Sequence, residues 1–376
     1  MKIVILGTAY PLRGGLAAFN ERLAKGLIEE GHDVEIYTFS LQYPNFLFPG
    51  SSQYAEETNP PQHLNIKVIV NSINPLNWLM VGLKLKKQKP DLIICKFWLP
   101  FMGPCFGSIL RLAKLNKHTK VISIIDNIIP HEKRFGDKLF AQYFVKTIDA
   151  FIAMSRSVAI DLKQFTTPQQ PIEYLAHPVY DHYGQAIGKN EAKAHLKLNP
   201  NDQYLLFFGI IRPYKGLDLL LEAFALAKLP ENVKLIIAGE YYTDSAPYIA
   251  QIKKHQLENK ILLHTHFIPD AEVKYYFCAV DIVAQPYHSA TQSGISQICY
   301  HFDKPMLVTN VGGLPEIVPH NIAGYVVEPN ATNIAQALEN FYNNHQEAQL
   351  SNGVKSLKHL FTWKYFIENM LKTLNS

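Results

Sequence analysis

The chain has 376 residues, of which 48 % are hydrophobic and 18 % charged, and its formal net charge is +4. This composition excludes a disordered or fibrous protein, and the length predicts two compact domains of roughly 180 residues each. The charge is too small to indicate nucleic-acid binding. It is unevenly spread, because residues 1–182 hold 20 Lys and Arg against 15 Asp and Glu.

The cysteines and the lack of a recognisable targeting signal indicate the cellular compartment that we expect for the protein. The four cysteines form no CxxC pair and lie in or beside apolar sequence: Cys95, Cys105, Cys278 and Cys299. We therefore expect buried, reduced thiols and a cytoplasmic protein. The apolar run at the N-terminus is too short for a signal-peptide core, and no stretch approaches the ~20 apolar residues of a membrane span. Contact with a membrane is therefore expected to be peripheral.

The first half of the chain predicts a doubly wound α/β sheet. Residues 2–6 (KIVIL) form an apolar strand, a helix follows with apolar residues three or four apart, and residues 34–39 form a second strand. This order implies parallel strands. Further strands are predicted at 66–70, 91–95, 121–125 and 150–154.

The same design restarts after a proline-rich segment at 166–182, which we interpret as a linker. Strands are predicted at 204–209, 234–239, 261–265, 281–286, 305–309 and 324–327, and helices near 216–228, 245–256, 270–279, 294–302 and 331–345. The chain is thus expected to comprise a first α/β domain (1–165), the linker, a second α/β domain (183–355) and a C-terminal helix (356–376) that packs back towards the first domain.

Two such domains are expected to face each other across a cleft, and in open α/β sheets ligands bind beyond the carboxyl ends of the strands. The first loop of this kind, residues 10–15, holds Arg13, Gly14 and Gly15 before a helix. Its glycines let a ligand approach the backbone and the free N–H groups of the helix. The alternative is an ordinary turn. The dinucleotide fingerprint GxGxxG is absent, because Gly7 lies seven residues before Gly14.

The loop at 209–216 carries two cations, Arg212 and Lys215, just before a predicted helix. A guanidinium and an ammonium beside a helix N-terminus suit a pyrophosphate group. The alternative is a solvated basic loop, which its position after an apolar strand disfavours.

The segment at 286–318 follows another strand and contains SATQSG before a helix, then Gly312-Gly313. Hydroxyl, amide and backbone N–H groups suit a sugar or a phosphate. The alternative is a surface loop rich in turn-forming residues.

The segment at 124–138 supplies Asp126, Asn127 and His131 after a strand of the first half. We expect Asp126 and Asn127 to bind acceptor hydroxyls, whereas a lone histidine is as often structural as functional. The sequence has no DxD triplet, HExxH or spaced Cys/His set, so we expect no bound metal.

The order and spacing of these motifs resemble retaining glycosyltransferases of the GT-B fold, family 4. The segments that carry the resemblance are YPLRGGLAAFNERLAKGLIEEGHDVEIYTF, FFGIIRPYKGLDLLLEAFA, LIIAGE, AVDIVAQPY and DKPMLVTNVGGLPEIV. The resemblance implies two Rossmann-like domains and transfer of a sugar from a nucleotide diphosphate sugar to an acceptor. It also implies that residues 1–165 form the acceptor-side domain and residues 183–355 the nucleotide-sugar-binding domain. It implies no cofactor beyond that donor.

The resemblance also implies roles for individual residues. Lys215 occupies the position of the phosphate-contacting lysine. The usual arginine position holds Ile210, and Arg212 is expected to replace it. A histidine of the first domain is replaced by Asp126, which joins Arg212 and Lys215 as a catalytic candidate. The acceptor-side candidates are Arg13, Asn127 and His131. The donor-binding candidates are Gly14, Gly15, Glu240, Thr291, Gln292, Ser293, Gly294, Ile295 and Gln297.

Two glutamates that the family places around the donor sugar correspond here to Ala290 and Ile298. We therefore weigh an active glycosyltransferase of polysaccharide biosynthesis, with a glycan, lipid-linked or other hydroxyl acceptor, against an inactive nucleotide-sugar-binding or scaffold protein of the same fold. An unrelated oxidoreductase is disfavoured because GxGxxG is missing. A predicted helix at 78–89 mixes apolar residues with lysines. It suits either an anionic membrane surface or a half-buried position on the protein.

Overall fold

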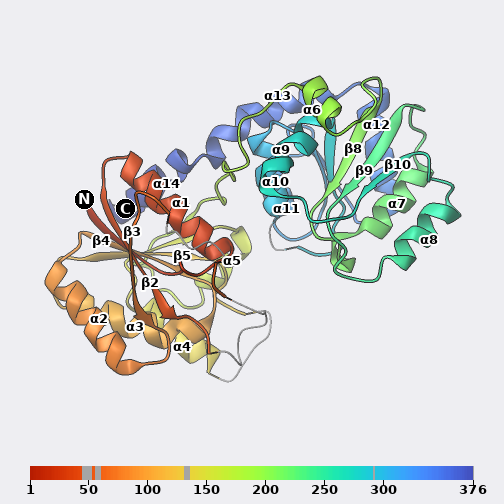
Figure 1. Ribbon diagram of the computed structural model, residues 1–376. Helices are drawn as coiled ribbons and strands as arrows, with labels where there is room; N and C mark the ends of the chain where they lie inside the picture. Colours follow the sequence, from red (N-terminus) through yellow and green to blue (C-terminus); the bar gives the residue numbers. More distant parts are fainter. Residues whose placement is uncertain (45–52, 56–60, 131–135, 291–292, 376) are drawn as a thin grey trace. The chain divides into compact units, whose positions relative to one another are not determined.

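The chain folds into two units, which are described separately (Figure 1). The computed structural model describes residues 1–44, 53–55, 61–130, 136–290 and 293–375. The first unit comprises Met1–Ala176 and Trp363–Ser376, and the second comprises His177–Thr362. Each unit is built on one parallel sheet with helices on both faces, which confirms the predicted class of two doubly wound Rossmann-like domains.

The sheet of the first unit has seven parallel strands in the order β3-β2-β1-β4-β5-β6-β7. The strands are β1 (Lys2–Leu6), β2 (Asp33–Leu41), β3 (Asn65–Asn71), β4 (Leu92–Phe97), β5 (Lys120–Ile125), β6 (Ala150–Ala153) and β7 (Ile172–Tyr174). All six strands expected in residues 1–165 are present. Central parallel strands are covered on both faces, which explains why β1, β4 and β6 read as continuous apolar runs.

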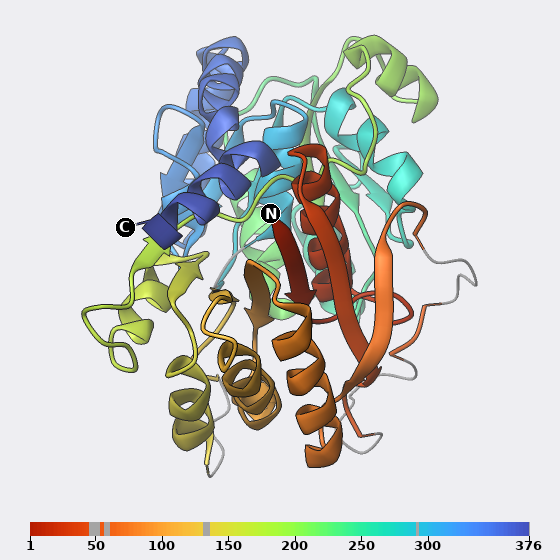
Figure 2. The ribbon, with the colours of Figure 1, turned by 90° about the vertical axis from the view of Figure 1, so that its left-hand side faces the viewer.

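Helices cover this sheet in two layers (Figure 2). The helices are α1 (Gly15–Glu29), α2 (Pro75–Gln88), α3 (Gly103–Lys114), α4 (Asp137–Val145), α5 (Arg156–Leu162) and α14 (Trp363–Lys372), with short 3-10 turns η2 (Pro100–Met102) and η5 (Thr373–Asn375). Residues of α2, α3, α4 and α5 share one apolar cluster, and residues of α1 and α14 share the other.

The C-terminal helix α14 packs on α1 within the first unit. The rings of Trp363 and Phe19 lie 5.1 Å apart. Gly26 allows the close approach, since a Cβ atom at that position would lie 2.6 Å from Cδ1 of Ile367. The last residues of the chain are therefore part of the core that begins with its first strand.

The segment interpreted as a linker contains a strand that the sequence did not reveal. Residues 172–174 form β7, which pairs with β6, and the N–H of Phe151 donates to the carbonyl of Pro171 at 2.9 Å. Prolines are tolerated at the start of an edge strand because the missing N–H faces away from the ladder. Because the segment is rich in prolines, the sequence did not predict β7, a three-residue strand that depends on pairing with β6.

The sheet of the second unit has six parallel strands in the order β10-β9-β8-β11-β12-β13. The strands are β8 (Gln203–Phe208), β9 (Val233–Ala238), β10 (Ile261–His264), β11 (Ile282–Gln285), β12 (Met306–Thr309) and β13 (Gly324–Val327). Each lies where the sequence predicts a strand.

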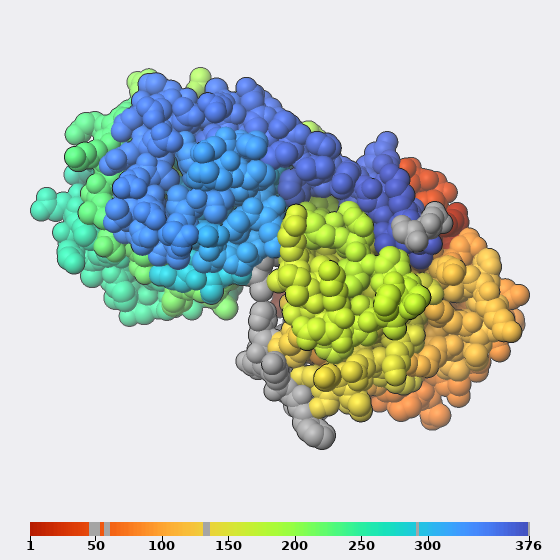
Figure 3. Space-filling view, turned by 180° about the vertical axis from the view of Figure 1, so that it is seen from behind, coloured from red at the N-terminus to blue at the C-terminus, as the bar shows by residue number. Residues whose placement is uncertain are grey.

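The helices of the second unit are α6 (Lys189–His195), α7 (Leu217–Leu226), α8 (Ala246–Lys254), α9 (Asp270–Ala279), α10 (Gly294–His301), α11 (Leu314–Ile317), α12 (Ala331–Asn343) and α13 (Glu347–Leu357), with 3-10 turns η3 (Pro213–Lys215) and η4 (Lys358–Phe361). Helices α12 and α13, in blue, form much of the face of this unit seen in Figure 3. Helix α12 packs on α7 over the sheet.

The strand order reverses once in each sheet, between β1 and β4 in the first unit and between β8 and β11 in the second. The loops after these strands diverge and leave space for a ligand at the carboxyl edge. The loops singled out in the sequence at 10–15, 209–216 and 286–293 follow β1, β8 and β11. Among the described residues, no helix is long and apolar enough to cross a bilayer.

Candidate functional site

The loops after β8 and β11 are held together by a glycine. Gly216 has a positive φ of 68°, and a Cβ atom there would lie 1.8 Å from the carbonyl oxygen of Pro286. Next to this contact the N–H of His288 donates to the carbonyl of Tyr214 at 2.9 Å. Only glycine fits this conformation and this approach. It fixes η3, and with it Lys215, beside the end of β11.

Lys215 points inward from η3 to a buried tyrosine. Its Nζ donates to Oη of Tyr287 at 2.7 Å and lies 4.2 Å from the centre of the same ring. Oη of Tyr287 lies 3.0 Å from Oγ of Ser293, and the carbonyl of Tyr287 accepts from Oγ1 of Thr309 at 2.6 Å. A chain of three polar groups thus joins the loop after β8 to the helix that follows β11.

The charge of the Lys215–Tyr287–Ser293 network favours an anionic ligand. Burial lowers the pKa of Lys215 from its ordinary value of 10.5 to about 8, since desolvation penalises the charged ammonium. Within the described part of the chain, no carboxylate forms an ion pair with Lys215. A phosphate oxygen would supply the missing counter-charge.

Helix α10 begins at this point. Ser293 is its N-cap, and its Oγ accepts from the N–H of Ile295 at 3.3 Å. Gly294 opens the helix under the ring of Tyr180, where a Cβ atom would lie 3.1 Å from the ring. The N-terminus of a helix carries unsatisfied N–H groups and a partial positive charge. The predicted donor-binding residues Ser293, Gly294 and Ile295 therefore come together with Lys215.

The other positions that the sequence assigned to the donor site differ in burial, and two of them are not described by the structure. Gln297 is 2 % exposed, and neither atom of its amide group has a partner in the part of the chain that the structure describes. Ala290 is half-buried, and Ile298 is buried. Thr291 and Gln292 lie outside the described residues.

Arg212 and Glu240 lie elsewhere on the same edge. Arg212 is exposed, and its guanidinium lies 5.2 Å from the ring centre of Tyr242 in the loop after β9. Glu240 is exposed, and its backbone carbonyl accepts from the N–H of Ile211 at 2.8 Å. The structure thus brings Lys215, and not Arg212, to Tyr287 and Ser293.

In the first unit, the loop after β1 leads into the N-terminus of α1. Gly14 is the N-cap with a positive φ of 103°, and no side chain caps the helix. Chain neighbours and the backbone of α1 apart, no atom of the described residues lies within 4 Å of where a Cβ of Gly15 would be. Arg13 is exposed, and its N–H donates to the carbonyl of Gln53 at 3.0 Å. These features leave the first N–H groups of a 15-residue helix accessible to a ligand.

A buried ion pair lies at the reversal point of the first sheet. Nζ of Lys96, near the end of β4, is 2.7 Å from a carboxylate oxygen of Asp126, which follows β5. The Lys96 side chain is 4 % exposed and that of Asp126 is 22 % exposed. Nζ of Lys96 also lies 3.8 Å from the ring centre of Phe19 on α1. Burial lowers the pKa of Lys96, and the charge of Asp126 opposes that shift.

Asn127 is half-buried beside this pair, and His131 lies outside the described residues. Two functional candidates were missed in the sequence. Tyr287 lies in the loop after β11, where no local pattern marks it, and its link to Lys215 spans 72 positions. Lys96 left a signal, because a lysine inside the apolar run LIICKF can be buried only with a partner.

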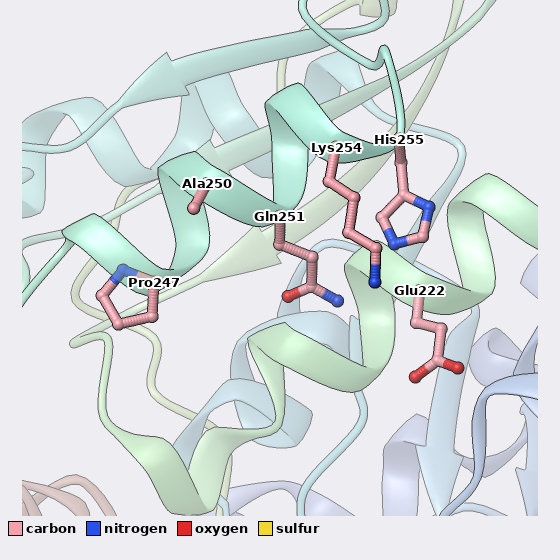
Figure 4. Close-up of a pocket in the computed structure, with 6 residues that line it drawn as sticks. All are labelled: Glu222, Pro247, Ala250, Gln251, Lys254 and His255. Atoms are coloured by element: carbon pink, nitrogen blue, oxygen red, sulfur yellow. The ribbon is translucent and has the colours of Figure 1, made fainter.

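Two pockets flank α8 on the second unit. One of about 500 Å³ is lined by Tyr214, Asp218, Asp244 and His288 among others. The other, of about 390 Å³, lies between α7 and α8 (Figure 4). They share Pro247 and Gln251. The carboxylates of Asp218 and Asp244 make the larger pocket unsuited to a diphosphate, although Tyr214 places it next to Lys215.

Metal ligands are not grouped in the described ranges: no set of three or more His, Cys, Asp or Glu side chains there could hold an ion. The four cysteines are free and buried, as expected.

Comparison with known proteins decides the family. Residues 188–355 match the model of glycosyl transferases group 1, and residues 13–181 match that of glycosyltransferase family 4. The chain belongs to this family of glycosyltransferases. The protein is therefore a member of an enzyme family, as the order of its motifs predicted. The two matched segments correspond to the two α/β units.

Similar proteins cover nearly the whole of this glycosyltransferase. An uncharacterized glycosyltransferase of Methanocaldococcus jannaschii is 22 % identical over 96 % of this chain and 95 % of its own length. The O-antigen chain mannosyltransferase C of Escherichia coli is 23 % identical over 98 % and 96 %. The Anabaena protein HepE, solved in complex with UDP, aligns over 100 % of both chains with a TM-score of 0.73 and 17 % identity. This structural similarity shows the shared GT-B fold.

Proposed function

We propose that this glycosyltransferase moves a sugar from a nucleotide diphosphate sugar to a hydroxyl group of a glycan or lipid-linked acceptor in the cytoplasm, with retention of the anomeric configuration and without a bound metal. The observation that carries the proposal is Lys215, a desolvated cation without a carboxylate partner among the described residues, next to the N-terminus of α10. The names of the E. coli mannosyltransferase and of the UDP complex of HepE support a nucleotide sugar and a glycan.

The chemical role of Lys215 follows from where charge develops. As the glycosidic bond breaks, negative charge grows on the departing diphosphate. A fixed ammonium and fixed N–H groups stabilise that charge most in the transition state, so they lower the barrier. The phenol of Tyr287 holds the ammonium in place, and Ser293 holds the phenol and the first turn of α10. Arg212 adds a second cation if its side chain leaves Tyr242 when the donor binds.

The first unit supplies the acceptor side. The carboxylate of Asp126 is fixed by Lys96 and remains partly exposed, so it can accept a hydrogen bond from a sugar hydroxyl. Arg13 and Asn127 lie in the loops after β1 and β5 and suit further acceptor contacts. Retention requires no protein nucleophile when the leaving group departs from the face that the acceptor attacks.

The proposal is tested in two steps. The purified chain is first screened for thermal stabilisation by UDP- and GDP-linked sugars. The stabilising donor is then assayed for hydrolysis and for transfer to glycan and lipid-linked acceptors, with and without EDTA. We expect stabilisation, EDTA-insensitive turnover, and a product whose NMR spectrum shows the anomer of the donor. A product with the inverted anomeric configuration would contradict retention, and loss of turnover with EDTA would contradict a reaction without a bound metal.

A second function is favoured by two apolar residues. Ala290 and Ile298 stand where the family resemblance places glutamates, and Ile298 is buried and cannot bond a hydroxyl group. An inactive nucleotide-sugar-binding protein would be stabilised by a donor and yet would neither hydrolyse nor transfer the sugar with any acceptor. Measurable turnover that is lost in Lys215→Ala would exclude this alternative.

A further inference from the structure

Helix α2 is apolar on two opposite faces. Its inner face packs on α3, where Val81 and Leu85 are buried and a Cβ atom at Gly82 would lie 2.6 Å from Cβ of Leu112. The outer face presents a row of exposed apolar side chains. The members of this outer stripe, with their exposed fractions, are Leu76 (75 %), Leu79 (46 %), Met80 (66 %) and Leu83 (45 %).

The spacing makes the stripe continuous. At 3.6 residues per turn the four side chains fall within an arc of about 100°. A surface helix normally turns a polar face to water, and a helix that is apolar all round is covered on its outer side as well. Figure 2 shows α2, in orange, on the outside of the first unit.

The charge around the stripe has one sign. The C-terminal half of α2 and the residue after it carry four lysines: Lys84, Lys86, Lys87 and Lys89. Residues 61–90 contain no Asp or Glu. An apolar stripe that continues into lysines is the pattern of a helix that lies in the interface of an anionic bilayer, with the lysines reaching the headgroups.

We infer that the outer stripe of α2 docks this protein on the surface of an anionic lipid bilayer. A second copy fits less well, because this segment has no carboxylates to pair with the lysines of its partner. The inference goes beyond the proposed function and does not depend on it, since docking requires only α2. It would bring the enzyme to acceptors carried by lipids.

The test is co-sedimentation of the full chain with vesicles of phosphatidylcholine alone or with about one third phosphatidylglycerol, at low salt and at about 1 M salt, where screening reaches ~3 Å. We expect binding only to the anionic vesicles and loss of binding at high salt. Lys87→Ala with Lys89→Ala should weaken partitioning about 25-fold, at roughly fivefold for each lysine. Leu76→Asn with Met80→Asn should weaken it about a hundredfold or more.

Leu226→Asn with Ile322→Asn is the matched control, because these side chains of the second unit are also exposed (55 % and 49 %). It should bind vesicles like the original protein. Circular dichroism verifies that all variants are folded, and turnover with a soluble acceptor measures the proposed function separately. Absence of binding to anionic vesicles at low salt would overturn the inference. So would equal binding by the α2 variants, or a dimer in sedimentation velocity that Leu76→Asn with Met80→Asn dissociates.

Discussion

Nucleotide binding should weaken as the pH rises from 7 to 9, because the ammonium that receives the diphosphate loses its proton in this range. Burial lowers the pKa of Lys215 to about 8 in the protein without ligand. Its near neighbours are the neutral Tyr287 and Ser293, and burial raises the pKa of Tyr287, so that phenol stays protonated. A diphosphate favours the charged lysine and therefore binds the protonated protein.

The magnitude follows from the fraction of protonated lysine. With a pKa of about 8, that fraction is about nine tenths at pH 7 and one tenth at pH 9. If the bound diphosphate holds the lysine charged, the dissociation constant should rise about tenfold between these pH values. Stability should change in the opposite direction. The folded-state pKa lies below the unfolded value, so the unfolded chain binds more protons between pH 8 and about 10.4, and the free protein gains stability as the pH rises through that window.

Isothermal titration calorimetry with a UDP- or GDP-linked sugar at pH 7, 8 and 9 measures the effect. Lys215→Arg is the control, because a guanidinium stays protonated throughout. Ionisation of the nucleotide affects both proteins equally, so the ratio of their dissociation constants isolates the lysine. A ratio that stays constant from pH 7 to 9 would refute the assignment of Lys215 as the diphosphate receptor.

Three further predictions concern single contacts. Lys215→Ala should lower kcat/KM in a transfer assay by one to three orders of magnitude, since a positioned donor contributes roughly 2–4 kcal/mol to the transition state, and an unchanged value would remove its catalytic role. Asp126→Asn should lower the free energy of unfolding by about 3 kcal/mol in urea, and Lys96→Met added to it should restore part of that stability but not activity. Gly216→Ala should lower the free energy of unfolding by about 3 kcal/mol, and Gly31→Ala by about 1 kcal/mol. Gly31 shares the positive φ, but no described residue other than its chain neighbours has an atom within 4 Å of its Cβ position, so equal losses of stability would contradict the Pro286 contact.

The strands could be predicted from local sequence because buried parallel strands carry their own signal. Runs such as IVIL in β1 and LIIC in β4 are apolar throughout, since helices cover both faces of the sheet. Strand β7 could not be found in this way. It has three residues beside Pro171, and its place in the sheet depends on pairing with β6.

Part of the candidate site in the second unit could be predicted from the sequence for a different reason. Lys215 and Ser293 lie in loops that directly follow strands, and the reversal of strand order brings such loops together. The sequence does not show which side chain connects them. Tyr287 does so through a hydroxyl group that meets Lys215 from 72 positions away, and burial of its ring made it look like an ordinary core residue.

In the first unit, a departure from the family pattern is coupled to a second residue. Asp126 stands where the family resemblance places a histidine, and a carboxylate so close to the core is costly without a counter-charge. Lys96 supplies that charge from the neighbouring strand at 2.7 Å, and the charge of Asp126 in turn opposes the lowering of the Lys96 pKa by burial. Each residue therefore makes the other tolerable. The exposed part of the carboxylate still has acceptor lone pairs for a ligand hydroxyl, so the ion pair provides a fixed acceptor of hydrogen bonds at this position.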